Sequence, residues 1–206
     1  MIRKALPEDL GDIVTIHMNG FDGFFLSSLG PSFLKTFYTD FLTDENGCCL
    51  VSVEDGRTVG FAVGVVDPSS YFRRTFRKRW PRLVLGSLGR VVKNPAVLAK
   101  LARRALTYSS SSSHGGTDSA LLSSIAVLPE FHNRKIGEQL LDAFLEESAR
   151  MGANEVVLTT DRHRNDKVIN FYKKMGFGVK RVFTSYEGRY MYELGLDLVT
   201  RHSVIH

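Results

Sequence analysis

The sequence predicts an α/β fold in which helices cover a mixed β-sheet, and three observations carry this prediction. Strand-like and helix-like runs alternate between residues 120 and 175. Glu54-Asp55-Gly56-Arg57 separates two β-rich runs, and an Asp-Gly pair tolerates the positive φ of a tight hairpin. Two more β-rich runs close the chain around Glu187-Gly188. The 206 residues suit one domain, 1–206, with a buried core.

The first third of the chain predicts a strand, two helices and a hairpin. Residues 2–6 form the strand, and Pro7, with two acidic residues after it, suits the start of a helix. Apolar residues then recur at helical spacing as far as His17, which we expect to be a core histidine with satisfied hydrogen bonds. Residues 20–30 form an aromatic loop, Pro31 opens the second helix, and residues 48–53 and 58–66 are the hairpin strands.

The last part of the chain predicts regular alternation. Residues 120–128 form a strand, residues 136–151 an amphipathic helix that Gly152 ends, and residues 155–160 another strand. A helix follows over residues 166–175, and strands at 177–186 and 189–196 form the final hairpin.

Residues 68–117 interrupt this alternation with a basic insertion. The segment contains eleven lysines and arginines and no acidic residue, whereas the rest of the chain carries sixteen basic and twenty-two acidic residues. We expect two or three short helices, starting near Trp80-Pro81 and Asn94-Pro95, and then a Ser/Gly-rich run. Residues 70–107 would attract an anionic surface, a membrane or a nucleic acid. A solvated basic face, a lid and a homodimer contact are the alternatives.

Composition and cysteine usage exclude several classes. Cys48 and Cys49 are adjacent, so they match no spaced metal motif and no disulfide framework. The histidines show no ligand spacing, so we expect no metal site. The sequence contains neither a signal-peptide pattern nor an apolar run long enough to cross a bilayer. We therefore expect a cytoplasmic protein.

The segment from Ile125 to Leu141 carries the first chemical motif. A strand ends at Pro129, a short basic loop follows, and a helix begins at Ile136. Helix N-termini present free N–H groups and a partial positive charge, so they bind phosphate. His132, Arg134 and Lys135 add hydrogen-bond donors, and Gly137 permits close approach of a ligand. The segment therefore predicts a pyrophosphate site.

A second motif begins at Asn165 and ends at Phe177. Asn165 precedes a helix, where its side chain would cap the helix or bond a ligand amide. Tyr172 lies two helical turns further on, and its phenol could donate a proton to a leaving group. The structural alternatives are a buried core aromatic at Tyr172 and a simple N-cap at Asn165.

Together the two motifs resemble the GNAT superfamily of acyl-CoA-dependent N-acyltransferases. The family's phosphate-loop pattern, Arg/Gln-x-x-Gly-x-Gly/Ala, falls on His132, Lys135 and Gly137, so only the last glycine is kept. The second pattern, Asn…Phe-Tyr-x-Lys-x-Gly-Phe, is complete. The resemblance implies a GNAT-like α/β (α+β) fold with a mixed, mostly antiparallel central sheet, flanked by helices and carrying the basic helical insertion.

The resemblance also implies the activity, transfer of an acetyl group from acetyl-CoA to a primary amine of a small molecule by direct attack. Tyr172 would protonate the departing thiolate, and an amide near Val127 would polarise the thioester oxygen. The acyl donor would contact the strand end, the loop and the second motif: Ile125, Ala126, Val127, His132, Asn133, Arg134, Lys135, Ile136, Gly137, Glu138, Asn165 and Tyr172.

The acceptor side is less defined by the sequence. In this family it borders the loop between the first two helices and the last hairpin, so Asp22, Phe24, Phe25 and Tyr190 are candidate substrate contacts. Many relatives carry a carboxylate base on the central strand, where this chain has Ser123 and Ser124. Proton removal through water is our expectation, with Asp22, Asp161 and Tyr190 as alternatives. A degenerate GNAT domain that docks through its basic insertion is the competing function.

Overall fold

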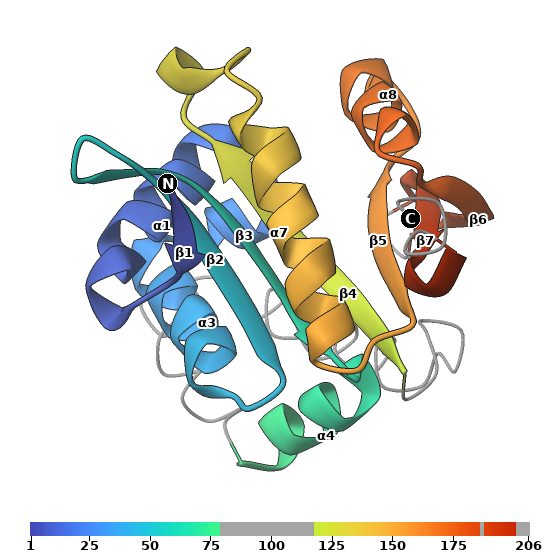
Figure 1. The fold of residues 1–206 in the computed structure, drawn as a ribbon, viewed down its shortest axis with the longest axis horizontal. Coiled ribbons are helices and arrows are strands. Elements are labelled where there is room, and N and C mark those ends of the chain that lie inside the picture. Colours follow the sequence, from blue (N-terminus) through green and yellow to red (C-terminus); the bar gives the residue numbers. More distant parts are fainter. Residues whose placement is uncertain (79–117, 186–187, 201–206) are drawn as a thin grey trace.

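The computed structural model describes residues 1–78, 118–185 and 188–200, and it confirms the predicted α/β architecture. In this part of the chain seven strands form one sheet in the order β1-β2-β3-β4-β5-β7-β6 (Figure 1). Only β4 and β5 pair in parallel, and every other neighbouring pair is antiparallel. The strands are β1 (Ile2–Lys4), β2 (Gly47–Glu54), β3 (Arg57–Val66), β4 (Ser119–Val127), β5 (Glu155–Asp161), β6 (Gly178–Thr184) and β7 (Tyr190–Asp197).

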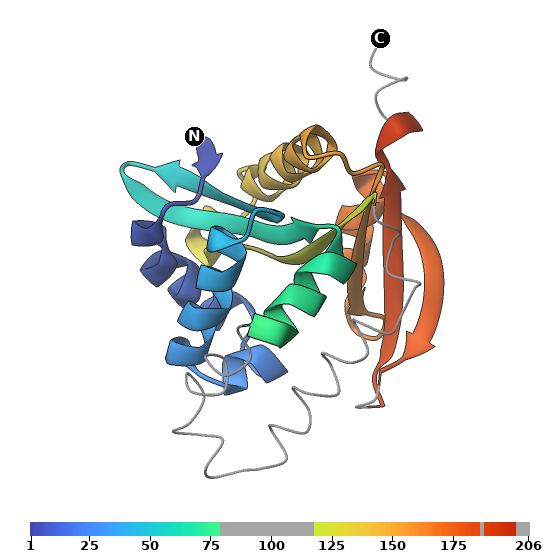
Figure 2. The same ribbon diagram turned by 90° about the horizontal axis from the view of Figure 1, so that it is seen from below.

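Helices cover both faces of the sheet. Figure 2 shows α1, α3 and α4 on one face and α7 on the other. The described helices are η1 (Pro7–Asp9), α1 (Leu10–Gly20), α2 (Phe25–Ser28), α3 (Pro31–Thr43), α4 (Pro68–Lys78), η2 (Pro129–Phe131), α7 (Ile136–Arg150) and α8 (Asp166–Lys174). None of them combines the length and the apolar character that a membrane crossing would require.

Most predicted elements are confirmed to within two residues, and local chemistry explains them. Asp55 and Gly56 both have positive φ, 49° and 76°, as the predicted turn between β2 and β3 requires. One expectation was incomplete, because the predicted loop at 20–30 contains the short helix α2. The described start of the predicted insertion is the helix α4, which begins at Pro68. The helix starts predicted at Trp80-Pro81 and Asn94-Pro95 lie outside the described residues.

The core forms on both faces of β3. On one face Phe33, Tyr38 and Phe61 are almost completely buried, and on the other Leu140 and Phe144 of α7 are equally buried. Gly64 permits this close packing, because a Cβ atom there would lie 2.5 Å from the Phe144 ring. The burial of these large apolar side chains on both faces stabilises the central strands against which the site is built.

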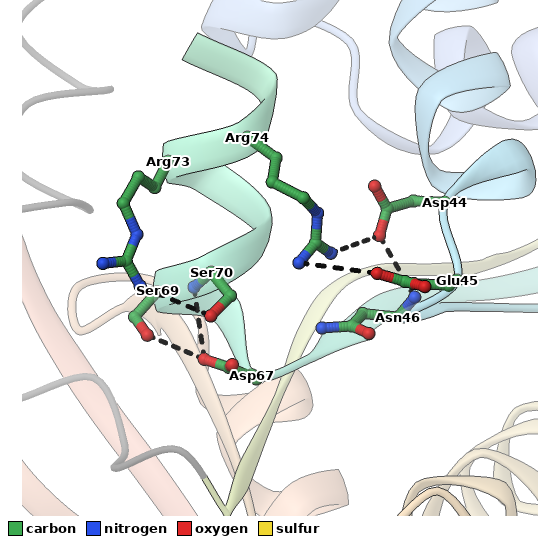
Figure 3. Close-up of polar contacts among 8 residues, drawn as sticks. All are labelled: Asp44, Glu45, Asn46, Asp67, Ser69, Ser70, Arg73 and Arg74. Carbon is green, nitrogen blue, oxygen red and sulfur yellow. Dashed lines mark hydrogen bonds and ion pairs between the residues drawn. The ribbon is translucent and has the colours of Figure 1, made fainter. Parts of the chain in front are cut away.

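Polar contacts fix the start of the insertion against the core (Figure 3). Asp67 caps α4, because its carboxylate accepts hydrogen bonds from the Ser69 hydroxyl at 2.7 Å and the Ser70 amide at 3.2 Å. Arg74 donates to the buried Asp44 at 2.7 Å and lies 3.8 Å from Glu45. The guanidinium of Arg74 is therefore paired with acidic side chains of the fold, whereas the side chain of Arg73 is exposed.

The sheet separates between its two central strands. β4 and β5 pair only between residues 119–121 and 155–157, although both strands continue beyond this point. Ser123 lies at an irregularity in the pairing with β3, because Val63 pairs with Ser124 while Gly64 pairs with Leu122. We call the region between residues 122–127 of β4 and 158–161 of β5 the split. Figure 1 shows the two strands diverging there.

Candidate active site

The edge of β4 that faces the split consists of main-chain groups. Val127 pairs with Gly60 of β3, and the Leu128 amide donates to the Val59 carbonyl at 2.9 Å. This register makes Gly60–Val127 a non-hydrogen-bonded pair, so the N–H and C=O of Val127 point away from β3. The same alternation turns the main chain of Ile125 toward the split, whereas Ala126 bonds β3. Among the described residues no strand pairs with this edge at Ile125 and Val127, and the Val127 carbonyl oxygen lies 2.9 Å from His132 Nε2.

A tight loop joins this edge to α7. Asn133 and Lys135 have positive φ, 63° and 60°, and α7 starts at Ile136, where the side chain of the N-cap residue Lys135 makes no capping hydrogen bond to the described residues. Lys135 thus adopts a left-handed conformation where the GNAT pattern has glycine. Its side chain and those of His132, Asn133 and Arg134 are exposed, whereas Ile136 is buried and can offer a ligand only its backbone. Free amides and nearby cations suit an anion at this end of α7.

α8 lies beside the start of α7. Lys174 pairs with Glu138 at 2.6 Å, and a Cβ atom at Gly137 would lie 3.8 Å from the Phe171 ring. The contact with Lys174 lowers the pKa of Glu138. The pair of Glu138 and Lys174, which are 36 residues apart in sequence, therefore brings the two motifs together in space.

Tyr172 and Asn165 differ in how tightly the fold holds them. Tyr172 is buried, and its ring makes edge contacts with Phe171 and Phe177; burial raises the pKa of its phenol, so the hydroxyl keeps its proton. Asn165 occupies the N-cap position of α8 without capping it. Its amide instead donates to the Thr160 hydroxyl at 2.7 Å and to the Asp161 carbonyl at 3.0 Å, which fixes the end of β5.

Side chains from distant segments meet on the face covered by α1. Ring contacts run from His17 to Phe21 and from Phe21 to Phe24, and the Arg189 guanidinium lies 5.7 Å from the Phe24 ring centre. Arg189 also donates to Asp161 at 3.0 Å. We call His17, Phe21, Phe24 and Arg189 the aromatic bridge. It connects α1 with the last hairpin and the end of β5.

The candidate substrate residues around this bridge differ in their exposure and in their contacts. Phe24 and Tyr190 are 42% and 52% exposed, and Tyr190 makes an edge contact with His163. Asp22 is exposed next to Phe21, and Phe25 is half-buried at the start of α2. Asp161 is engaged by Arg189, which makes it a weaker candidate for a general base.

Comparisons with known proteins decide the family. The family model described as "Acetyltransferase (GNAT) family" matches residues 16–177. The chain belongs to the GNAT acetyltransferase family. A comparison with curated protein sequences finds no match.

Solved GNAT structures share the fold at low sequence identity. SsHAT is 18% identical with a TM-score of 0.69, over 96% of this chain and 98% of that chain. The ribosomal-protein-S18-alanine N-acetyltransferase from Escherichia coli is 16% identical with a TM-score of 0.60, over 96% and 93%. An aminoglycoside 6'-acetyltransferase type Ii is 13% identical with a TM-score of 0.62, over 96% and 97%. These similarities establish the fold of this GNAT protein.

At the His17 end of the aromatic bridge this GNAT protein buries three polar side chains, those of His17, Tyr38 and Ser124. His17 Nδ1 lies 2.6 Å from the Tyr38 hydroxyl, which also hydrogen-bonds Ser124 of β4. Burial lowers the pKa of His17 to about 4, so the ring is neutral at pH 7. His17 is indeed a core residue, but it is not fully satisfied, because Nε2 has no partner among the residues that the structure describes.

Sequence reasoning missed the partners of Arg189 and Lys174, although Lys174 is the lysine of the second pattern. Arg189 reaches Asp161 from 28 residues away, and Lys174 reaches Glu138 from 36 residues away. No local pattern marks such pairs, because the sheet order decides which residues meet. Among the described residues, no three His, Cys, Asp or Glu side chains gather as a metal site would need.

Proposed function

We propose that this GNAT protein is an N-acetyltransferase that moves the acetyl group of acetyl-CoA to a primary amine of a small molecule. One observation carries the proposal: within the described part of the chain, the main-chain edge at Ile125 and Val127 pairs with no other strand and leads directly into the start of α7, which its N-cap side chain does not cap. An extended amide-bearing chain fits such an edge, and a pyrophosphate fits free helical amides. These are the two parts that a coenzyme A thioester presents in sequence. The proposal keeps the cytoplasmic location inferred from the sequence.

The chemistry we propose is direct attack of the amine on the thioester. The amine nitrogen bonds to the carbonyl carbon, the C–S bond breaks, and the thiolate takes a proton. Tyr172 is the proposed donor of that proton, since its buried phenol is held protonated by its surroundings. The nitrogen loses its proton through water, because Ser124 is bonded to Tyr38 and Asp161 is paired with Arg189.

The support for a small acceptor comes from the aromatic bridge. Its contacts join α1 to the last hairpin on the proposed acceptor side, so a long chain would have to cross them. The aminoglycoside 6'-acetyltransferase similar in fold acts by its name on a small amine, and the E. coli relative acts on a ribosomal protein. We favour the first class.

Isothermal titration with acetyl-CoA, followed by a panel of amines assayed by thiol release, tests the proposal. We expect saturable binding of acetyl-CoA and thiol release that depends on one class of small amine. Absence of binding at millimolar acetyl-CoA would refute the cofactor assignment. Release that requires a peptide N-terminus would refute the small-molecule acceptor and leave the cofactor assignment standing.

We also propose a second role for the basic insertion, docking on an anionic surface through residues 70–107. The absence of acidic residues over 68–117 favours it. Sedimentation with anionic vesicles tests it, using Arg73→Glu in the exposed part of α4. If Arg73→Glu sediments with the vesicles less than the wild type does at low salt, and binds acetyl-CoA equally well, docking is supported. Equal sedimentation of vesicles with and without anionic lipid contradicts it.

A further inference from the structure

One nitrogen of the His17 imidazole is buried without a hydrogen-bond partner. His17 is 2% exposed, and its Nδ1 lies 2.6 Å from the Tyr38 hydroxyl. Its Nε2 has no partner among the residues that the structure describes. Nearly all buried polar groups in proteins are hydrogen-bonded, so an exception at this position calls for an explanation.

The contacts of Tyr38 determine which kind of partner Nε2 requires. Tyr38 has a single hydroxyl hydrogen and contacts both His17 and Ser124. A phenol is a stronger acid than a neutral imidazole N–H, and an imidazole nitrogen is the better acceptor, so Tyr38 donates to Nδ1 and Ser124 donates to Tyr38. Burial lowers the pKa of His17 to about 4, so the ring carries one hydrogen at neutral pH. That hydrogen lies on Nε2, which therefore requires an acceptor atom.

His17 lies beside the split, on the face of the sheet that α1 covers. One turn later in α1, a Cβ atom at Gly20 would lie 3.3 Å from the Ala126 side chain, and the Ser124 side chain bonds α3 on the same face. The main-chain edge assigned to the cofactor leads instead to α7, which lies on the opposite face (Figure 2). The imidazole therefore lies on the acceptor side of the split.

The Phe21 ring separates this imidazole from the exposed part of the aromatic bridge. The ring centre of Phe21 lies 4.7 Å from that of His17, and Phe24, which is 42% exposed, packs against Phe21. Gly23 has a φ of 77°, and a Cβ atom there would meet nothing within 4 Å, so the turn between the two rings faces open space. Outward movement of this turn would give a small molecule a route to the imidazole.

We propose that His17 selects the acceptor: the amine carries an uncharged oxygen, as a hydroxyl or carbonyl group, which displaces the Phe21 ring and accepts a hydrogen bond from Nε2. The inference rests on the proposed function, because it concerns the amine that this function requires. An uncharged oxygen fits better than a carboxylate, since a neutral imidazole does not compensate a buried anion and Arg189 is paired with Asp161. Amino alcohols and amino amides belong to this class.

Thiol release from acetyl-CoA with matched pairs of amines, measured on the full chain, tests the inference. Ethanolamine and propylamine, or 2-amino-1,3-propanediol and 3-aminopentane, differ by oxygen in place of carbon at nearly equal size. We expect kcat/KM to be about tenfold higher or more for the oxygen-bearing member of each pair, because the analogue leaves a buried donor unpaired. Glycinamide should likewise be a better acceptor than glycine, whose oxygen atoms belong to a carboxylate.

Matched variants assign this preference to His17. His17→Leu removes the donor and should reduce the ratio within each pair to about one, and a ratio cancels any general loss of activity. His17→Gln should keep much of the preference, because its amide can accept from Tyr38 and donate to the substrate. Ile13→Val, one turn earlier in α1, loses a buried methyl group and should keep the wild-type ratio.

Nitrogen spectra of protein labelled with ¹⁵N-histidine test the same site without turnover. The signal that His17→Gln removes belongs to His17, and we expect it to show a neutral ring with the hydrogen on Nε2. A hydrogen on Nδ1 would overturn the inference. This measurement decides the matter even if His17→Leu does not fold.

The kinetic outcomes also separate this inference from the proposed function. Equal rates for both members of each pair in the wild type, or a wild-type ratio that persists in His17→Leu, would show that Nε2 does not recognise the acceptor. A fall in kcat that is equal for all amines in His17→Leu, with the ratio unchanged, would assign the nitrogen to the acyl donor or to folding. Absence of thiol release with every amine, although acetyl-CoA binds, would refute the small-amine function and this inference with it.

Discussion

The two sides of the split are built from different parts of the chain. The β4 edge and the loop after it use main-chain groups of consecutive residues, from Ile125 to Glu138. The aromatic bridge uses side chains from α1, the following loop and the last hairpin, and its Arg189 also bonds Asp161 of β5. A main-chain site tolerates substitution, since its amides remain when side chains change. A side-chain site loses function with single substitutions and can differ between relatives of one fold.

The largest effect is expected at Tyr172, which lies outside both regions and serves the chemical step. Tyr172→Phe should lower kcat by a hundredfold or more, roughly the contribution of a general acid. The dissociation constant for acetyl-CoA should not change, because the ring and its contacts with Phe171 and Phe177 remain. Tyr192→Phe, on the half-buried face of β7, is the matched control and should keep full activity. Equal rates for the two variants would exclude Tyr172 from the reaction.

The next largest effect is a loss of stability in acid, caused by His17 at one end of the bridge. Its pKa is about 4 in the folded protein against an ordinary value of 6.5. Unfolding therefore binds a proton between these values, and the free energy of unfolding should fall by about 3 kcal/mol from pH 6.5 to pH 4.

Urea unfolding at a series of pH values measures this loss. His17→Gln can still hydrogen-bond Tyr38 but does not titrate, so it should lose the part of the slope that the histidine causes and keep only the small slope of the carboxyls near pH 4. His163→Gln, which removes an exposed ring, should retain the wild-type slope. The carboxyls whose pKa values are lowered, those of Asp9, Asp67, Glu138 and Asp197, lose stability only as the pH approaches 4, and they do so equally in every variant. An unchanged slope in His17→Gln would contradict the prediction.

The same contrast, between consecutive main-chain groups and side chains from distant segments, explains which parts of the molecule the sequence predicts. The strand end at Val127, the loop and the start of α7 are consecutive, so local turn and helix rules place them correctly. The aromatic bridge requires knowing that Arg189 lies beside Asp161 and Phe24, which only the sheet order and register determine. The helix α2 was missed for a related reason: four residues carry too little periodicity to identify a helix.

Arg189 tests whether the bridge forms the acceptor side. Arg189→Ala removes both the contact with Phe24 and the hydrogen bond to Asp161, so KM for the amine should rise about three- to tenfold, as expected for a few lost contacts. The dissociation constant for acetyl-CoA should stay the same. Arg181→Ala is the matched control, because Arg181 also pairs with a carboxylate, Glu193, and lies over an aromatic ring, Phe183.

The control separates binding from folding. Arg181→Ala leaves the buried Glu193 without this cation, so it should lower stability without raising KM. A rise in KM that is equal in the two variants would mean that hairpin stability, and not the bridge, governs acceptor binding.

The smallest effect is expected at Lys135, which lies in the loop after β4. This residue stands where the GNAT pattern has a glycine. A left-handed lysine costs roughly 1 kcal/mol, and Lys135→Gly removes that cost while adding roughly 0.5–1 kcal/mol of chain entropy to the unfolded state. The two terms nearly cancel, so the free energy of unfolding should change by less than about 1 kcal/mol. Coenzyme A affinity should fall only as far as one exposed charge contributes, and high salt should remove the difference from wild type. A large loss that persists in high salt would show that the lysine side chain, and not the backbone, forms the phosphate site.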